Sequence, residues 1–216
     1  MTSKASFLCE EYRSYVGSRR TKRVSKQALQ NCLEKFGRAQ EALTLKKTIG
    51  VSQGGAGGPV PASQTLLHAT LPEHFEGARL LFQEYASGLG VDLCFQDFEH
   101  ELKELPGEYS EPNGCILLAF VNSELAGCVA LRPFSPGICE MKRMYVRPVF
   151  RGKGIGRALA EEVVREARNR SYRKMRLDSL PIMKEAQALY RSLGFREIDA
   201  YRPNPIEGAV YMELIL

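Results

Sequence analysis

Hydrophobic and polar positions change their period several times after residue 64, and these changes predict alternating strands and helices. Some short segments are apolar almost throughout, as buried strands are, whereas in longer segments apolar residues recur every three or four positions, which is the period of one helical face. The predicted strands are 65–69, 115–121, 124–134, 138–146, 174–180, 195–201 and 209–216. The predicted helices are 72–87, 95–105, 154–169 and 183–193.

The order of these elements predicts a mixed α/β domain. Asn122 and Ser123 form a turn between two strands, so residues 115–134 should be an antiparallel hairpin. The helix at 154–169 lies between two strands, and a strand–helix–strand crossover normally makes its strands parallel. We therefore expect a mixed sheet with flanking helices. The final strand, 209–216, could pair with another subunit and give a homodimer.

The pattern before residue 65 is different. Residues 49–64 are rich in Gly, Pro and Ser and keep no apolar period, which is typical of a linker that cannot bury enough surface to offset its ordering entropy. Upstream of it, one apolar stripe predicts a helix from Ser25 to about Lys46. We expect three parts: a helical or disordered extension at 1–48, a linker at 49–64 and a folded domain at 65–216.

Positive charge is concentrated in the extension. The formal net charge is +5, but residues 1–50 hold 11 Lys or Arg and 4 Glu, a net of +7, which leaves −2 for the remainder. The folded domain therefore lacks the basic surface that nucleic-acid binding requires. The extension could be an organelle-targeting peptide, a docking helix or a solvated tail. Glu10 and Glu11 count against a mitochondrial presequence, which is poor in acidic residues.

Neither a membrane segment nor a metal motif is visible. The longest apolar runs are far shorter than the roughly 18–20 residues of a membrane helix, and residues 1–30 lack the apolar core of a secretory signal. The 6 cysteines form no CxxC pair and only 3 histidines occur, so zinc-ligand spacing is absent. We expect no metal, no membrane contact and a reducing compartment, the cytoplasm.

A glycine-rich basic segment joins the strand ending at Val146 to the next helix. It reads Arg151-Gly152-Lys153-Gly154-Ile155-Gly156. Glycines at a helix N-terminus let main-chain N–H groups approach a ligand closely, and the helix end carries roughly half a positive charge. Arg151, Lys153 and Arg157 add full charges around it. Together these residues predict a phosphate-binding site.

Two common phosphate-binding loops do not fit this segment. A P-loop requires G-x-x-x-x-G-K-[ST], but Lys153 is followed by Gly154. A dinucleotide fingerprint requires G-x-G-x-x-G, but the third glycine position is Leu159. At this point a glycine-softened turn with basic residues on the surface remains the alternative.

The segment resembles the signature loop of the GNAT superfamily of N-acetyltransferases, R-x-x-G-x-G after a strand that here ends Met144-Tyr145-Val146. A second stretch, AQALYRSLGF from Ala186 to Phe195, is similar to that family's A-x-x-L-Y-x-x-x-G-F. It begins 30 residues after Gly156, with a strand between them, as in the family. The likeness covers about residues 65–216.

The resemblance implies a splayed mixed sheet that binds acetyl-CoA as the acetyl donor. The pantetheine arm would lie between the strands that hold Val146 and Leu177 and would take main-chain hydrogen bonds from the first of them. The pyrophosphate would bind the N–H groups of the glycine-rich loop. The implied cofactor-binding residues are Met144, Tyr145, Val146, Arg151, Gly152, Lys153, Gly154, Ile155, Gly156 and Arg157.

Aminolysis of a thioester needs an acid for the departing thiolate, a base for the amine and stabilisation of the carbonyl oxygen. The resemblance places Tyr190 beside the cofactor sulfur as the acid; the alternative is a packing tyrosine. Glu140 is the candidate base, directly or through water, because six residues separate it from Val146 and would put both on one face of the strand. It could instead pair with Lys142 or Arg132. A main-chain N–H near residue 145 would polarise the carbonyl.

One position departs from the family pattern. Many members have Asn three residues before the alanine of the second motif, where it contacts pantetheine. That position is Met183, so water or another side chain must replace the contact.

The acceptor is less well defined by the sequence. Asp178 and Ser179 end a strand that should line the cleft, and residues 201–205 could face it. Arg132 or Arg202 would suit an amine that carries a carboxylate. We expect a small-molecule amine, amino-acid-like in character. A protein lysine or N-terminal amine, or a CoA-binding module without turnover, are the alternatives.

Overall fold

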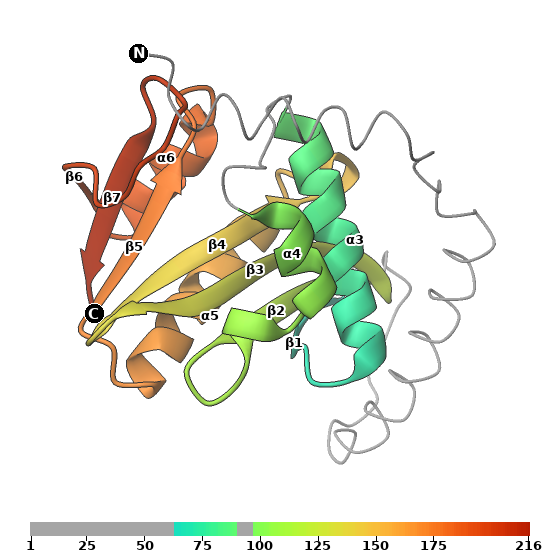
Figure 1. Cartoon of the computed structure of the whole chain (residues 1–216). Helices are drawn as coiled ribbons and strands as arrows, with labels where there is room; N and C mark the ends of the chain where they lie inside the picture. The colour runs from blue at the N-terminus through green and yellow to red at the C-terminus, as the bar shows by residue number, and fades with distance from the viewer. Residues whose placement is uncertain (1–62, 90–96) are drawn as a thin grey trace, which may run out of the picture.

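A computed structural model describes residues 63–89 and 97–216 (Figure 1). The basic extension, its expected helix from Ser25 and the linker up to residue 62 lie outside the described residues. Gln64, which we expected to end the linker, instead opens the first strand.

Each predicted strand or helix of the folded domain has a counterpart at the expected place. The strands are β1 (Gln64–His68), β2 (Cys115–Val121), β3 (Glu124–Ser135), β4 (Ile138–Val146), β5 (Lys174–Ser179), β6 (Arg196–Ile198) and β7 (Val210–Ile215). The helices are α3 (Pro72–Leu89), α4 (Phe98–Glu104), α5 (Ile155–Asn169) and α6 (Lys184–Ser192), with 3-10 turns η2 (Gly107–Tyr109) and η3 (Pro148–Phe150).

The seven strands form one sheet in the order β1-β2-β3-β4-β5-β7-β6. Strands β1 to β4 are antiparallel to their neighbours, and β4 and β5 are parallel because α5 crosses over between them. The mixed sheet is therefore confirmed. Strand β7 lies between β5 and β6 and pairs with both. Strand β6 pairs with Tyr211, Met212 and Glu213, so this part of β7 has no free edge, and the homodimer stays a prediction.

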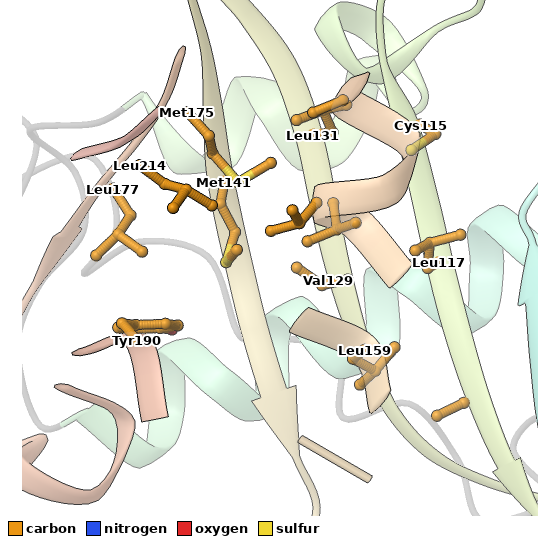
Figure 2. Close-up of a cluster of buried hydrophobic side chains, with 14 of the residues drawn as sticks. Cys115, Leu117, Val129, Leu131, Met141, Leu159, Met175, Leu177, Tyr190 and Leu214 are labelled. Atoms are coloured by element: carbon orange, nitrogen blue, oxygen red, sulfur yellow. The ribbon is translucent and has the colours of Figure 1, made fainter. Parts of the chain in front are cut away.

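Helices cover both faces of the sheet, with α3 and α4 on one side and α5 on the other (Figure 1). Strand β2 is buried throughout because alternate side chains enter two separate clusters. Cys115 and Leu117 pack with α5, whereas Ile116 and Leu118 pack with α3. Figure 2 shows the α5-side cluster. The cysteines of the described residues are all free and buried, as small apolar side chains are.

Strands β4 and β5 pair over only three residues each, Ile138–Glu140 with Lys174–Arg176. Beyond this pairing they diverge toward α6 (Figure 1), although β4 continues to Val146 and β5 to Ser179. Among the described strands, none pairs with β4 on this side beyond Glu140. Main-chain groups of its second half are therefore left to another partner, and the splayed sheet is confirmed.

A bulge interrupts β4 just after the splay begins. Cys128 pairs with Tyr145 and Ala130 pairs with Lys142. One residue of β3 therefore lies opposite two residues of β4. Arg143 lies within this bulge with φ 55°, in the left-handed region. For a residue with a side chain, that conformation costs about 1–3 kcal/mol and persists only where surrounding contacts enforce it.

Contacts of the Arg143 side chain stabilise the bulge. Its guanidinium forms a bidentate ion pair with Glu101 of α4, with an Nε–Oε1 distance of 2.8 Å. It also lies 4.9 Å from the centroid of the Phe98 ring. Because both partners come from α4, that helix and the bulge in β4 fix each other's position.

Candidate active site

A cavity of about 820 Å³ opens where β4 and β5 diverge. Its walls come from α3, the second half of β4, the segment from Pro148 to Gly156, the end of β5 and α6. Ligand pockets are typically about 300–1,000 Å³. The cavity is therefore large enough for a substantial organic molecule.

Eight of the ten predicted cofactor-binding residues line this cavity: Met144, Tyr145, Val146, Arg151, Gly152, Gly154, Ile155 and Gly156. Lys153 and Arg157 do not. The Lys153 Nζ lies 5.5 Å from the centroid of the Phe150 ring, and Arg157 donates to Ser192 Oγ at 2.9 Å. Their charges still add to the positive potential around the loop.

The turn before α5 requires glycine at two positions. Gly152 has φ 74° and Gly154 has φ 79°, which residues with side chains rarely adopt. Gly154 is the N-cap of α5 and offers no side-chain cap, so the first N–H groups of the helix lack an intrahelical acceptor. No atom of the described chain lies within 4 Å of a Cβ built at either glycine. The loop therefore presents bare N–H groups and a helix end, a suitable arrangement for binding an anion.

Arg151 borders the same part of the cavity. Its Nε donates to the carbonyl oxygen of Val146 at 3.0 Å, which ties the guanidinium to the end of β4. The side chain thus adds a fixed positive charge next to the glycine-rich turn.

Tyr190 of α6 also lines the cavity. Its ring packs beside Leu177 (Figure 2) and 5.8 Å from the Phe195 ring, measured between centroids. Burial raises the pKa of the hydroxyl well above its usual value, so the phenol is protonated at neutral pH. Within the described part of the chain, no group hydrogen-bonds to this hydroxyl.

Glu140 does not lie where a regular strand would put it. The extra residue of the bulge reverses the alternation, so Glu140 and Val146 point to opposite faces and our expectation of a shared face is wrong. Its fully buried carboxylate accepts hydrogen bonds from Arg132 Nε at 2.9 Å and the Tyr201 hydroxyl at 2.8 Å. Arg202 lies 3.3 Å from it. Glu140 does not line the cavity, and the expected alternative, pairing with Arg132, is confirmed.

Lys142 and Asp178 are an ion pair in the cavity wall, with 3.4 Å between Nζ and Oδ1. Asp178 also accepts hydrogen bonds from Arg202 at 2.6 Å and Asn204 at 3.1 Å. Burial lowers the pKa of Lys142 to about 8, although Asp178 and Glu140 oppose the shift. Burial alone would raise the pKa of Asp178, but the charges of Lys142 and Arg202 hold it below its usual value.

The residues that we predicted to bind the acceptor fall into two groups. Asp178 and Ser179 line the cavity, whereas Arg132 and Arg202 do not and instead pair with Glu140 and Asp178. Lys142 was not among the candidates. Its position two residues after Glu140 on the same strand face was the one signal in the sequence that could have suggested it.

A separate group of His68, Cys115 and Glu166 presents three potential metal ligands within 4.8 Å of one another. None of the three lines the cavity. Arg170 pairs with Glu166 and would repel a cation there. Burial raises the pKa of the Cys115 thiol to about 12, so the thiol is protonated at neutral pH. We assign this group no part in the chemistry of the cavity, and a metal-free reaction stays a prediction.

Among the described helices, none combines the length and the apolar character needed to cross a bilayer.

Comparison with known proteins agrees with this geometry. Residues 78–195 match the Acetyltransferase (GNAT) family. The chain is 39% identical over 156 residues to an uncharacterized N-acetyltransferase of Schizosaccharomyces pombe, a match covering 71% of this chain and 96% of that protein. It is 32% identical over 100 residues to the N-acetylaspartate synthetase of Danio rerio, covering 45% of this chain and 36% of that protein.

A solved structure has the same fold. The PaiA N-acetyltransferase of Thermoplasma acidophilum, in complex with coenzyme A, aligns with a TM-score of 0.56 at 19% identity. The alignment covers 71% of this chain and 99% of that one.

Proposed function

The chain belongs to the acetyltransferase (GNAT) family, and on that premise we propose that it transfers the acetyl group of acetyl-CoA to the primary amine of a small, amino-acid-like molecule. One observation carries the proposal. The glycine-rich start of α5 and Tyr190 line a single cavity, so an anion-binding helix end and a phenol would lie along the same bound molecule.

The residues of the cavity suit acetyl-CoA in three places. Its diphosphate would bind the N–H groups from Gly152 to Gly156, with Arg151 beside it. Its pantetheine arm would run between the diverging strands, where the second half of β4 offers main-chain groups without a strand partner among the described residues. Its thioester, the acyl donor of the reaction, would then lie near Tyr190.

Tyr190 acts in this proposal as the acid that protonates the departing thiolate. Its raised pKa keeps the phenol protonated at neutral pH, so the hydroxyl can donate. A main-chain N–H near Tyr145 would stabilise the charge that develops on the carbonyl oxygen. The bulge at Arg143 supports this role, because it interrupts the ladder with β3 next to that residue.

The proton of the amine needs a different route. Glu140 is not favoured as a direct acceptor, because its carboxylate already binds Arg132, Tyr201 and Arg202 outside the cavity wall. We propose that the proton leaves through water. Lys142 is a titratable group in the cavity wall, and a pKa of about 8 suits proton exchange near neutral pH.

The amino-acid-like acceptor is supported by two observations. Lys142 places a positive charge on the cavity wall, where it could attract a carboxylate. The N-acetylaspartate synthetase of Danio rerio shares 32% identity with this chain over 100 residues.

A screen of acceptors with acetyl-CoA, read by release of free thiol, tests this proposal. We expect turnover with one or more amino acids and at least a roughly tenfold lower kcat/KM for the corresponding amino acid amide, since removal of a charged hydrogen bond costs about 1.5–3 kcal/mol. Peptides with a free N-terminus or lysine serve as the comparison. Turnover with peptides alone would instead make the chain a protein acetyltransferase.

Deletion of residues 1–60 should leave folding and turnover intact. All seven strands begin at or after Gln64, and the truncated chain keeps the Ser63 N–H that donates to Asn122 at 3.1 Å. Thermal unfolding followed by circular dichroism, together with the thiol-release assay, should give the same Tm and kcat as the full chain. An unfolded product would contradict the division at residues 49–64.

A further inference from the structure

We infer that Ser179 binds the pantetheine arm of acetyl-CoA through its side-chain hydroxyl. The inference rests on the proposed function, because it names a residue of the same cavity. It also changes our first expectation, which placed Ser179 on the acceptor side.

The Ser179 hydroxyl is buried without a partner. The residue is 5% exposed, and its Oγ makes no hydrogen bond within the described part of the chain. The other such atom among the described residues is Arg170 Nε, whose guanidinium already pairs with Glu166 and Glu111. An unsatisfied buried hydroxyl is unfavourable, so Ser179 Oγ needs a hydrogen-bond partner that the described residues do not supply.

The position of Ser179 matches the path of the arm. It is the last residue of β5 and lines the cavity beyond the point where β4 and β5 separate. On its face of β5 the preceding side chains are Met175 and Leu177, which are apolar and buried. Met183, which starts α6 across the same wall, is apolar as well. Ser179 is therefore the side chain on this face of β5 that can hydrogen-bond.

The chemistry of the pantetheine arm indicates that Ser179 would bind one of its amide groups. Pantetheine carries two amide groups, each with a donor and an acceptor. Main-chain groups on the β5 side of β4 can bind only groups that face β4, so a group that faces β5 needs its partner there. A serine hydroxyl both donates and accepts, and it can satisfy either end of an amide. It would thereby supply the contact that Met183 cannot make.

The experiment compares two ligands, coenzyme A and 3′,5′-ADP, which shares the nucleotide but lacks the arm. Ser179→Ala should weaken coenzyme A binding about three- to tenfold, as loss of one net hydrogen bond does, and leave 3′,5′-ADP affinity unchanged. Isothermal titration calorimetry measures both. The Tm of the unliganded variant should not fall, because the substitution removes a hydroxyl that has no partner.

Two further variants make the result specific. Ser179→Ala combined with Met183→Asn should recover coenzyme A affinity, since an amide at that neighbouring wall position offers a new partner to the arm. Ser110→Ala, at an exposed serine outside the cavity, should change neither affinity. Equal weakening of both ligands, or no weakening of coenzyme A, would overturn the inference. Failure of the unaltered protein to bind coenzyme A would overturn the proposed function as well.

Discussion

Replacing Arg151 by Glu and Gly154 by Asp together should lower the affinity for acetyl-CoA by at least about 100-fold. The first change removes a guanidinium that borders the cavity, and charged hydrogen bonds are worth about 1.5–3 kcal/mol each. The second places a carboxylate among the N–H groups at the start of α5, where it would compete with the diphosphate and repel it. Both effects act on binding of the same anion, so their consequences should reinforce each other.

The fold should survive this double substitution. Gly154 has φ 79°, but aspartate enters the left-handed region more readily than most residues do, and no described atom lies within 4 Å of the new Cβ. Arg151 gives up one hydrogen bond to the carbonyl of Val146 at the rim. Circular dichroism should therefore show a folded protein, and calorimetry would report binding rather than unfolding.

A matched control reverses the charge of another arginine, one that lies within α5. Arg165→Glu lies at an exposed position of α5, outside the cavity, where Arg165 pairs with Glu162. It should leave acetyl-CoA affinity almost unchanged. If the double variant bound acetyl-CoA as tightly as the unaltered chain, the glycine-rich turn would not be the diphosphate site.

The glycine-rich turn could be predicted from the sequence because its conformation depends on residues that are adjacent in the chain. Glycines at residues 152 and 154 allow positive φ, the apolar period of α5 begins directly after them, and both features can be read from adjacent residues. The alternation of apolar runs likewise predicted the sheet and its parallel crossover. These features depend on neighbours in the chain, which a sequence displays directly.

The bulge in β4 could not be predicted in this way. Arginine has no preference for the left-handed region, and Arg143 adopts it because Glu101 and Phe98, about 40 residues earlier, hold its guanidinium. One inserted residue reverses the alternation of every later side chain in the strand. The face assigned to Glu140 was wrong for this reason alone.

Contacts between charged and polar residues far apart in the sequence also accompany the end of β6. The apolar pattern predicted a strand to Tyr201, whereas β6 ends at Ile198. The chain instead turns so that Tyr201 donates to Glu140 and Arg202 to Asp178. Buried carboxylates need such partners, and no local pattern reveals which residues will supply them.

Tyr190→Phe should lower kcat by about 100- to 10,000-fold, the usual contribution of a positioned general acid. The affinity for acetyl-CoA should change less than about twofold, because phenylalanine fills the same place in the α5-side cluster beside Leu177 and Phe195. A large fall in kcat without loss of binding would separate proton donation from packing. Steady-state thiol release and calorimetry give the two quantities.

The control is another tyrosine whose hydroxyl has a structural partner. Tyr172 donates to the carbonyl of Asn113 at 2.8 Å and does not line the cavity. Tyr172→Phe should therefore leave kcat unchanged. Equal turnover by both variants would make Tyr190 a packing residue and leave protonation of the thiolate to water.

The pH dependence gives an independent test of the same role. Burial raises the pKa of Tyr190, so the acid stays protonated as pH increases through the usual range of a phenol. The unaltered enzyme should then show no loss of kcat from ionisation of this residue up to about pH 10, the ordinary phenol pKa. A decline in kcat below that pH that is present in the unaltered chain and absent from Tyr190→Phe would mean that Tyr190 ionises in the working range, and the donor role derived from its burial would be wrong.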